Sequence, residues 1–426
     1  MRVRLVALLV PSVLACTDEA DCGYNGACVG GRCECAAPWR GPECQALDLQ
    51  PAVGSAGYDV PDTSSWGGSV VQGDDGRFYM YASEMVAHCG IGSWTRNSRV
   101  VLASADNLSV PFVFERELFG VFSHEPVATR APTGEYVLFF TSTRLGCGPR
   151  GNKSCVPREL CPGANTTDCN PGGPTCWSGC TGGATSPGCF DHATEASPRV
   201  RFPTFMTWAR TPAGPFSEPV LVYSGADQPA DDAPATGDTN MACVIFEDGS
   251  LAGIWRGDRK VAHHADPDYQ YQYRVSARDW RDPSSYAWGE ALAPFNIFPS
   301  LVGPNDTRNC GIEDPTLWVD ASGVLHALVH NWRAGGHAAS ADRGKTWRWY
   351  GGACSSSRGS GSLDWTRSAW PAEVAFSDGS RVTPHRRERP HAVLGADGVL
   401  AALTTGVQMD YAPDRTWTLL QLANVG

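Results

Sequence analysis

Short runs of apolar residues, separated by polar turns, recur along most of this chain. Pairs of such runs flank the same kind of turn residue, a glycine: Gly76, Gly134, Gly249, Gly323 and Gly398. Around Gly323, for example, residues 311–319 include one apolar run and residues 324–329 form the next. Two apolar runs joined at a glycine turn predict an antiparallel β-hairpin.

A third apolar run follows several of these hairpins, as at residues 101–106, 205–210 and 336–342. Repeats of this size, with about four strands each, are typical of the blades of a β-propeller. The five repeats therefore predict an all-β fold, a five-bladed β-propeller over residues 62–426. Uneven spacing of the turn glycines indicates that long insertions decorate the loops.

Composition and charge narrow the class of protein. The 426 residues include 47 Gly, 31 Pro and 15 Trp, and the formal net charge of −11 argues against nucleic acid or an anionic membrane as partner. Residues 1–15 carry two arginines and then an apolar run, and the 17 cysteines indicate an oxidising compartment. We expect a cleaved signal peptide at 1–15, no membrane span and a secreted protein.

The largest insertion, residues 144–200, lies in the second repeat. It holds seven cysteines among Gly, Pro, Asn and Thr, a composition that predicts disulfides because it cannot bury a core. A zinc site is the alternative, although no suitable histidine pattern accompanies the cysteines. Glycosylation is expected at asparagines that begin N-x-Ser/Thr triplets: Asn107, Asn152, Asn165 and Asn305.

Six cysteines cluster after the signal segment, and a segment this short needs disulfides to fold. Their spacing, with Cys33-Glu34-Cys35 and a following Cys44, resembles an EGF-like module over residues 16–45. This resemblance implies the disulfides Cys16–Cys28, Cys22–Cys33 and Cys35–Cys44. The module either binds a protein partner or acts as a stapled spacer, and residues 46–61 are predicted to form a linker.

Residues 340–347, Ser-Ala-Asp-Arg-Gly-Lys-Thr-Trp, resemble the Asp-box of sialidases and other propellers. In that motif the aspartate caps a hairpin turn and the tryptophan packs between strands. The motif supports a propeller fold, and by itself it carries no chemistry.

The first strand of each predicted blade lies nearest the propeller axis, so residues at its start meet in one central funnel. These positions are polar, charged or aromatic in all five repeats: residues 65–68, 123–126, 238–241, 312–315 and 387–391. The agreement among the repeats predicts a binding or active site at the axis. The alternative is that these side chains only satisfy exposed strand ends.

The pattern resembles the five-bladed propellers of glycoside hydrolase family 43 and its relatives, over about residues 62–422. The resemblance implies a general acid two residues before the proline of the fourth blade, which is Glu313 here. It also implies aspartates in the first and third blades, where this chain has Gly67 and Asn240, with Asp238 close by.

Glycosidic cleavage needs a proton donor and a second carboxylate, about 5 Å away for retention and further for inversion. Acidic residues of the same ring are the candidates for the second role: Glu125, Asp314 and Glu388. Glu388 lies between two arginines in the sequence, which predicts an ionised carboxylate suited to a base. A structural network of ion pairs is an equally good interpretation of these charges.

Ligand contacts are expected from Trp66, His124, Asp238, Asn240, Arg387, Arg389 and His391. The arginines belong to a dense basic cluster in an acidic chain, which favours an acidic or sulfated sugar. Residue spacing indicates no metal site. Analogy with the family alone suggests Ca²⁺ near the axis, bound through His391 or Asp314.

The sequence therefore favours a secreted glycoside hydrolase that acts on a polysaccharide or glycan. The alternative is a non-catalytic carbohydrate-binding or adhesion protein on the same fold, which the glycine at position 67 favours. A sialidase-type enzyme is a third interpretation, but a single Asp-box in five repeats counts against it.

Overall fold

The computed structural model describes residues 15–54, 56–86, 90–94, 98–120, 123–142, 204–223, 240–258, 270–288, 312–331, 333–351, 365–410 and 415–426. The expected signal peptide apart from residue 15, the cysteine-rich insertion, Asp238 and three of the expected glycosylation sites (Asn152, Asn165 and Asn305) lie outside these ranges. Asn107 is described and lies exposed in a turn. Among the described residues, no helix has the length and apolar character needed to cross a bilayer.

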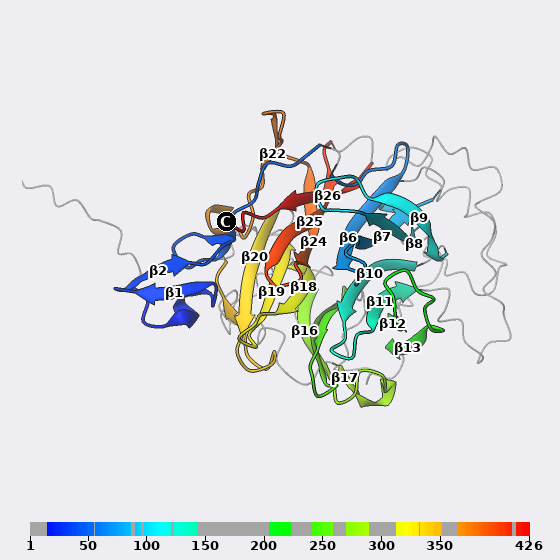
Figure 1. Ribbon diagram of the computed structural model, residues 1–426, viewed down its shortest axis with the longest axis horizontal. Coiled ribbons are helices and arrows are strands. Elements are labelled where there is room, and N and C mark those ends of the chain that lie inside the picture. The colour runs from blue at the N-terminus through cyan, green and yellow to red at the C-terminus, as the bar shows by residue number, and fades with distance from the viewer. Residues whose placement is uncertain are drawn as a thin grey trace, which may run out of the picture.

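The described strands form five four-stranded antiparallel sheets arranged as the blades of a β-propeller (Figure 1). Blade one contains β6 (Ser64–Gln72), β7 (Phe78–Met85), β8 (Ser98–Ala105) and β9 (Val113–Phe119). Blade two contains β10 (Ser123–Arg130), β11 (Tyr136–Ser142), β12 (Thr204–Ala209) and β13 (Val220–Tyr223). Blade three contains β14 (Ala242–Ile245), β15 (Leu251–Asp258), β16 (Gln270–Ala277) and β17 (Tyr286–Trp288).

Blade four contains β18 (Glu313–Val319), β19 (Leu325–Asn331), β20 (Ala334–Ser340) and β21 (Arg348–Trp349). Blade five contains β24 (Arg386–Leu394), β25 (Leu400–Gln408), β26 (Trp417–Leu422) and, as its outermost strand, β5 (Gly57–Tyr58). The remaining short elements are η2 (Ile91–Ser93), η4 (Pro283–Ser285), η5 (Trp365–Arg367), β22 (Val374–Ala375) and β23 (Arg381–Val382). The predicted five-bladed, all-β fold is confirmed.

Strand β5 closes the ring between the two ends of the propeller sequence. It pairs with β26 through Gly57–Leu419 and Tyr58–Thr418, and the Tyr58 hydroxyl donates a hydrogen bond of 2.5 Å to Glu84 of blade one. Upstream, Leu49 bridges to Ala423. Part of the segment predicted as a linker is therefore built into blade five and its seam with blade one.

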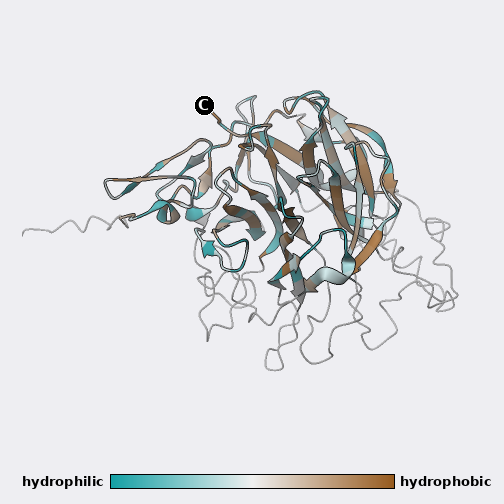
Figure 2. Cartoon of the chain, turned by 60° about the horizontal axis from the view of Figure 1, so that its bottom comes forward, coloured by the Kyte–Doolittle hydropathy of each residue, from teal (hydrophilic) through white to brown (hydrophobic). Residues whose placement is uncertain are grey.

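The hairpin turns follow from local chemistry. In blade four, Oδ1 of Asp320 accepts hydrogen bonds from the backbone N–H groups of Ser322 and Val324, and Gly323 takes the left-handed conformation with φ of 87°. The strands between such turns are largely hydrophobic, as Figure 2 shows by colour. Their apolar side chains pack between neighbouring blades, as Trp255 of blade three does beside Tyr223 of blade two.

The Asp-box forms the β20–β21 hairpin as its motif predicts. Oδ1 of Asp342 accepts hydrogen bonds from the backbone N–H groups of Lys345 and Thr346, and Oδ2 accepts one from the Thr346 hydroxyl. Trp347 is buried in a core cluster with residues of blades three and four. The hairpin lies at the outer edge of its blade, so it supports the fold and stays away from the axis.

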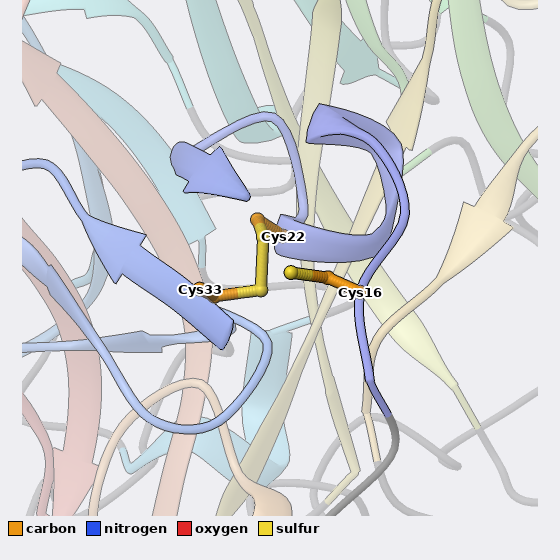
Figure 3. Close-up of side chains that lie close together, drawn as sticks. All are labelled: Cys16, Cys22 and Cys33. Carbon is orange, nitrogen blue, oxygen red and sulfur yellow. A yellow bond between two sulfur atoms is a disulfide. The ribbon is translucent and has the colours of Figure 1, made fainter. Parts of the chain in front are cut away.

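A small disulfide-bonded module precedes the propeller. It contains η1 (Glu19–Cys22), β1 (Gly26–Val29), β2 (Arg32–Cys35), β3 (Trp39–Arg40) and β4 (Ala46–Leu47). Its disulfides join Cys16 to Cys28, Cys22 to Cys33 and Cys35 to Cys44, the same pairs that the EGF-like resemblance implies. Figure 3 shows Cys16 beside the Cys22–Cys33 bridge. All three sulfur atoms are in disulfides, so this close group is not a metal site.

The module docks on blade four, beside β20 (Figure 1). Trp39 stacks on Trp318 with 6.3 Å between ring centroids, and its ring lies 4.8 Å from that of His337. Ion pairs from Asp21 to Arg348 and from Glu43 to Arg367 surround this aromatic contact. Because exposed ion pairs contribute little, we infer that the aromatic contact carries most of the docking energy.

Tyr58 and Val53 test whether the residues before position 62 belong to the propeller. Tyr58 is fully buried, whereas Val53 is 37% exposed. We expect Tyr58→Ala to lower the free energy of unfolding by about 4 kcal/mol, because it empties a core site and removes the contact to Glu84. Val53→Ala should change it by less than about 0.5 kcal/mol. Urea denaturation measures both, and equal effects would contradict a structural role for β5.

Candidate functional site at the propeller axis

Four inner strands share one irregularity near their starts. A β-bulge interrupts the pairing of β6, β10, β18 and β24 with their second strands, and at each bulge one residue has positive φ: Gly67, Glu125, Asp314 and Arg389. Left-handed backbone costs a residue with a side chain about 1–2 kcal/mol, and such strain concentrates at functional sites. Asn240 takes the corresponding place directly before β14 of blade three.

Arg389 joins the residues of this ring. Its Nη1 forms an ion pair with Oε1 of Glu125 at 3.0 Å, and it donates hydrogen bonds to Oδ1 of Asp314 at 3.2 Å and to Oδ1 of Asn240 at 3.4 Å. The arginine is 1% exposed, so these contacts lie deep at the axis. Blades two, three, four and five therefore meet at one guanidinium group.

Gly67 occupies the fifth ring position, and Arg389 explains why no side chain stands there. A Cβ atom on Gly67 would lie 2.2 Å from Cδ and 2.5 Å from Cγ of Arg389, far inside van der Waals contact. The stem of the arginine thus fills the space in which a blade-one side chain would begin. The central arginine can occupy its place only because residue 67 has no side chain, so the arginine and the absence of an aspartate depend on each other.

The two carboxyl groups that contact Arg389, those of Asp314 and Glu125, have pKa values shifted in opposite directions. Burial would raise the pKa of Asp314, but a hydrogen bond of 2.8 Å with Nε2 of His330, together with the charges of His330, Arg389 and Arg256, holds it well below its usual value. Burial raises the pKa of Glu125, and the opposing charge of Arg389 only partly offsets it. Asp314 is therefore an anion, and Glu125 holds a proton more readily than an ordinary glutamate.

Glu313 and Glu388 are the acidic residues of the ring that reach solvent most. Their side chains are 30% and 13% exposed, compared with 6% for Asp314. They lie on β18 and β24, the inner strands of adjacent blades, which a hydrogen bond between Ala392 and Thr316 connects. We call these two more exposed residues the mouth of the site, and we call Arg389 with its buried partners the floor.

The two glutamates have different partners. The carboxylate of Glu313 forms an ion pair with Nη1 of Arg256, from β15 of blade three. Burial raises the pKa of Glu388 to about 7, with Arg386 3.8 Å away as a weak counter-charge. The shift is opposite to the direction predicted from the arginines on either side of Glu388 in the sequence.

Arg387 does not face the axis, and this explains the difference. Its guanidinium donates to the Pro371 carbonyl at 2.7 Å and to the Gln421 side chain, and complete burial lowers its pKa to about 9. The β24 bulge falls between Glu388 and His391, so Arg387 and Arg389 do not share a face as residues two apart in a regular strand would. The two arginines, close in the sequence, therefore lie in different environments: Arg387 contacts Pro371 and Gln421, and Arg389 lies at the axis.

The other predicted contact residues lie around the floor, mostly buried. Nδ1 of His124 lies 2.6 Å from Oγ of Ser98, and its ring stacks on Trp94. Trp66 is buried with Met85, Ile91 and Trp94, so it offers little surface for stacking on a sugar. His391 is also buried, which lowers its pKa to about 3 and keeps the ring neutral.

Arg256 and His330 belong to the site but do not appear among the residues predicted from the sequence. Both lie near the ends of second strands, β15 and β19, while the prediction considered only first strands. His330 directly follows the apolar run 324–329, and Arg256 directly follows 251–255. A charged residue closing the second run of a repeat is the signal that could have identified them.

Glu313, Asp314 and His330 place oxygen and nitrogen atoms within 4.8 Å of one another, as metal ligands would. However, Asp314 already accepts hydrogen bonds from Arg389 and His330, and Glu313 pairs with Arg256. Ca²⁺ prefers six to eight oxygen ligands, and two adjacent guanidinium groups oppose a divalent cation. The residues in this arrangement do not fit the Ca²⁺ suggested by analogy.

No protein-family model matches this chain, and no curated protein sequence matches it either. Solved structures of similar shape include Zg3597, a family 117 glycoside hydrolase of the marine bacterium Zobellia galactanivorans, with 9% identity, TM-score 0.48 and coverage of 90% of this chain and 91% of that one. Another is a thermostable family-43 glycoside hydrolase, with 10% identity, TM-score 0.45 and coverage of 88% and 92%.

A third is the α-L-arabinofuranosidase PaAbf62A of Podospora anserina in complex with cellotriose, with 9% identity, TM-score 0.44 and coverage of 91% and 98%. Similarities of this size carry no argument about chemistry. The assignment of the fold rests on the order of the strands in the five sheets.

Gly67 and Gly76 separate the strain of left-handed backbone from the close approach of Arg389. Both have positive φ, but a Cβ on Gly76 would meet nothing within 4 Å. We expect Gly76→Ala to lower the free energy of unfolding by about 1 kcal/mol, and Gly67→Ala by about 3 kcal/mol or more, because it also displaces the arginine. Chemical denaturation measures both. Equal losses would show that Arg389 does not depend on the glycine.

The raised pKa of Glu388 predicts the pH dependence of stability. The folded state holds this proton up to about pH 7, whereas an unfolded glutamate releases it near pH 4.5, so the contribution is full below pH 4.5 and is lost as pH rises through 7. Between pH 5 and 7.5 this contribution to the free energy of unfolding should fall, so the stability of the wild type relative to Glu388→Gln should decrease by about 1–2 kcal/mol over that range. Urea titrations at several pH values test this. A relative stability that does not change with pH would place the titration elsewhere.

Proposed function

We propose that this protein is a carbohydrate-active propeller that hydrolyses glycosidic bonds at the axis of the ring. The observation that carries the proposal is the pair of solvent-reaching glutamates on adjacent inner strands. Burial raises the pKa of Glu388 to about 7, and Glu313 forms an ion pair with Arg256. A carboxyl group that retains a proton near neutral pH, together with a second carboxyl group held by an arginine, suits the two roles that glycosidic cleavage requires.

In this reaction Glu388 donates its proton to the oxygen of the leaving sugar, so that the departing group does not leave as an alkoxide. The Glu313 carboxylate faces the positive charge that develops on the anomeric carbon. It acts there as nucleophile, or as the base that activates a water molecule. These roles exchange those implied by the family resemblance, which makes Glu313 the acid.

The residues of the floor position this pair and take no direct part in bond cleavage. Asp314 lies in the strained bulge that follows Glu313, and Arg389 holds Asp314 in place. Arg256 fixes the orientation of the Glu313 carboxylate from the neighbouring blade. Because the floor is buried and internally paired, the substrate occupies the mouth above it.

The proposal includes an acidic or sulfated glycan as substrate, although fewer arginines lie beside the two glutamates than the sequence suggested. Arg387 and Arg389 bind internal partners, so the arginines beside the two glutamates are Arg256, which pairs with Glu313, and the partly exposed Arg386, 3.8 Å from Glu388. Guanidinium groups at a site mouth suit carboxylate or sulfate substituents. The three disulfides of the N-terminal module support secretion, and a protein ligand of that module belongs to the same proposal.

A second candidate function, carbohydrate binding without cleavage, is favoured by a separate observation. Glu125 and Asp314 are neutralised by Arg389 and lie buried, so the ring holds fewer reactive carboxylates than its sequence suggests. In this alternative, Glu313 and Glu388 contact sugar hydroxyl groups and no bond breaks.

A panel of neutral, uronic and sulfated polysaccharides separates the two functions. We expect new reducing ends with at least one class, and a loss of about 100-fold or more in rate for Glu313→Gln and for Glu388→Gln. The rate should also fall as pH rises above about 7, where Glu388 loses its proton. Glu373→Gln is the control, because that residue pairs with Arg381 on an exposed surface and should keep full activity.

Activated aryl glycosides identify the proton donor, because their leaving groups need little protonation. Glu388→Gln should retain much more activity on these substrates than on polysaccharide, whereas Glu313→Gln should lose both. Binding without new reducing ends on any polysaccharide, and weakened by either substitution, would support the second candidate and overturn the first.

A further inference from the structure

Two buried histidines lie beneath the docked N-terminal module, far from the proposed reaction. His326 on β19 and His337 on β20 are 1% and 0% exposed. Their rings stack 5.3 Å apart, between Trp318 on one side and Tyr350 on the other. Trp39 of the module covers them, with its ring 4.8 Å from that of His337.

Hydrogen bonds connect these histidines in a chain with one direction. Nε2 of His326 lies 3.2 Å from Oδ2 of Asp320, and Nδ1 of His326 lies 3.0 Å from Nε2 of His337. Because the carboxylate only accepts, Nε2–H of His326 donates to it, and Nδ1 of the neutral ring must then accept from His337. Nδ1 of His337, at the end of the chain, has no hydrogen-bond partner among the described residues.

An additional proton finds no hydrogen-bond acceptor within the Asp320–His326–His337 chain. An added proton makes one ring a cation and, since each hydrogen bond in the chain already contains a proton, it leaves an N–H at Nδ1 of His337 without an acceptor. Burial, followed by the neighbouring His326, lowers the pKa of His337 well below its usual value. The aromatic rings around it attract a cation, but not enough to replace water at a fully buried site.

The other charged and titratable groups at this interface do not neutralise such a cation. Asp320 is the nearest anion and already accepts from His326. Asp21 of the module pairs with Arg348, and Glu43 pairs with Arg367. The hydroxyl of Tyr350 donates to the Ala20 carbonyl at 2.7 Å, and Tyr24 packs on the cluster that contains Tyr350.

We propose that the Asp320–His326–His337 chain is a proton-sensitive latch that holds the N-terminal module on blade four at neutral pH and releases it in acid. Release lifts Trp39 and opens the histidines to water, where a charged ring is solvated. The interface itself supplies the coupling, because the module covers His337 and contacts blade four on both sides of it. The proposal does not depend on the function proposed for the axis.

The sign and size of the effect follow from linkage. A histidine with its pKa lowered in the docked state stabilises docking above the pKa of the free state, near 6.5, and that contribution is lost as pH falls below it. At pH 5.0 the equilibrium should favour release by about 30-fold more than at pH 7.5. Protonation of both rings in the released state would make the shift larger.

Hydrogen exchange of the full-length protein tests the latch. The peptides to follow contain β3 and β4, where the Leu47 N–H donates to the Ala369 carbonyl at 2.8 Å across the interface. Peptides of β25 serve as internal reference, and intrinsic exchange rates are corrected for pH. We expect relative protection of the module to fall about 30-fold from pH 7.5 to pH 5.0.

Three variants separate titration from packing. The double variant His326→Phe, His337→Phe keeps the ring stack without a titrating group and should show equal protection at both pH values. Tyr350→Phe is the matched control: it removes a docking hydrogen bond without changing charge, so it should lower protection by the same factor at both pH values. The double variant His326→Gln, His337→Gln removes the titrating groups in a second way, with polar side chains, and should likewise show equal protection at both pH values.

Each result decides the proposal. Wild-type protection that changes less than about threefold between the two pH values, or that rises in acid, would overturn it. So would a pH response that survives in either double variant. If the phenylalanine double variant does not fold, the glutamine double variant decides: equal protection at both pH values supports the latch, and a pH response that survives overturns it.

Discussion

The guanidinium of Arg389 is the contact on which the centre of this propeller depends. Five inner strands converge at the axis, and their polar ends need partners there, because water has little access. Arg389 is this partner for Glu125, Asn240 and Asp314, which come from three different blades. Its stem passes over Gly67 of a fourth. Loss of the arginine would leave the buried Glu125 without its arginine partner and Asp314 with His330 as its remaining close partner, which is far more costly than losing a surface ion pair.

The central contact also divides the acidic residues into two groups. Those that bind Arg389 are buried and internally satisfied, so they form a floor. Glu313 and Glu388 are left at the mouth, in contact with solvent and with different partners. Sequence proximity does not predict this division. Glu313 and Asp314 are neighbours in the chain, yet at the bulge the side chain of Glu313 pairs with Arg256 and that of Asp314 pairs with Arg389.

The repeat pattern was enough to predict the five blades, the Asp-box hairpin and the ring of polar positions at the axis. These features depend on local periodicity and turn chemistry, which the sequence displays directly. The pKa of Glu388 was predicted in the wrong direction, because the fate of Arg387 depends on a bulge and on Gln421, 34 positions later. The role of β5 was missed for the same kind of reason. Two residues have no periodicity, and their pairing with β26 is visible only when the ring is closed.

Gly67 deserves a different interpretation from the one that the sequence favours. By itself, a glycine at the position where the resemblance to family 43 implies an aspartate suggests that activity has been lost. In this structure the glycine is required because the side chain of Arg389 passes over it. The glycine is therefore explained by packing around Arg389, and it gives no information about Glu313 and Glu388. The presence or absence of an aspartate at this position therefore cannot distinguish an enzyme from a binding protein. That distinction rests on Glu313 and Glu388, because they are the most exposed of the described ring carboxyl groups and pair with Arg256 and Arg386, not with Arg389.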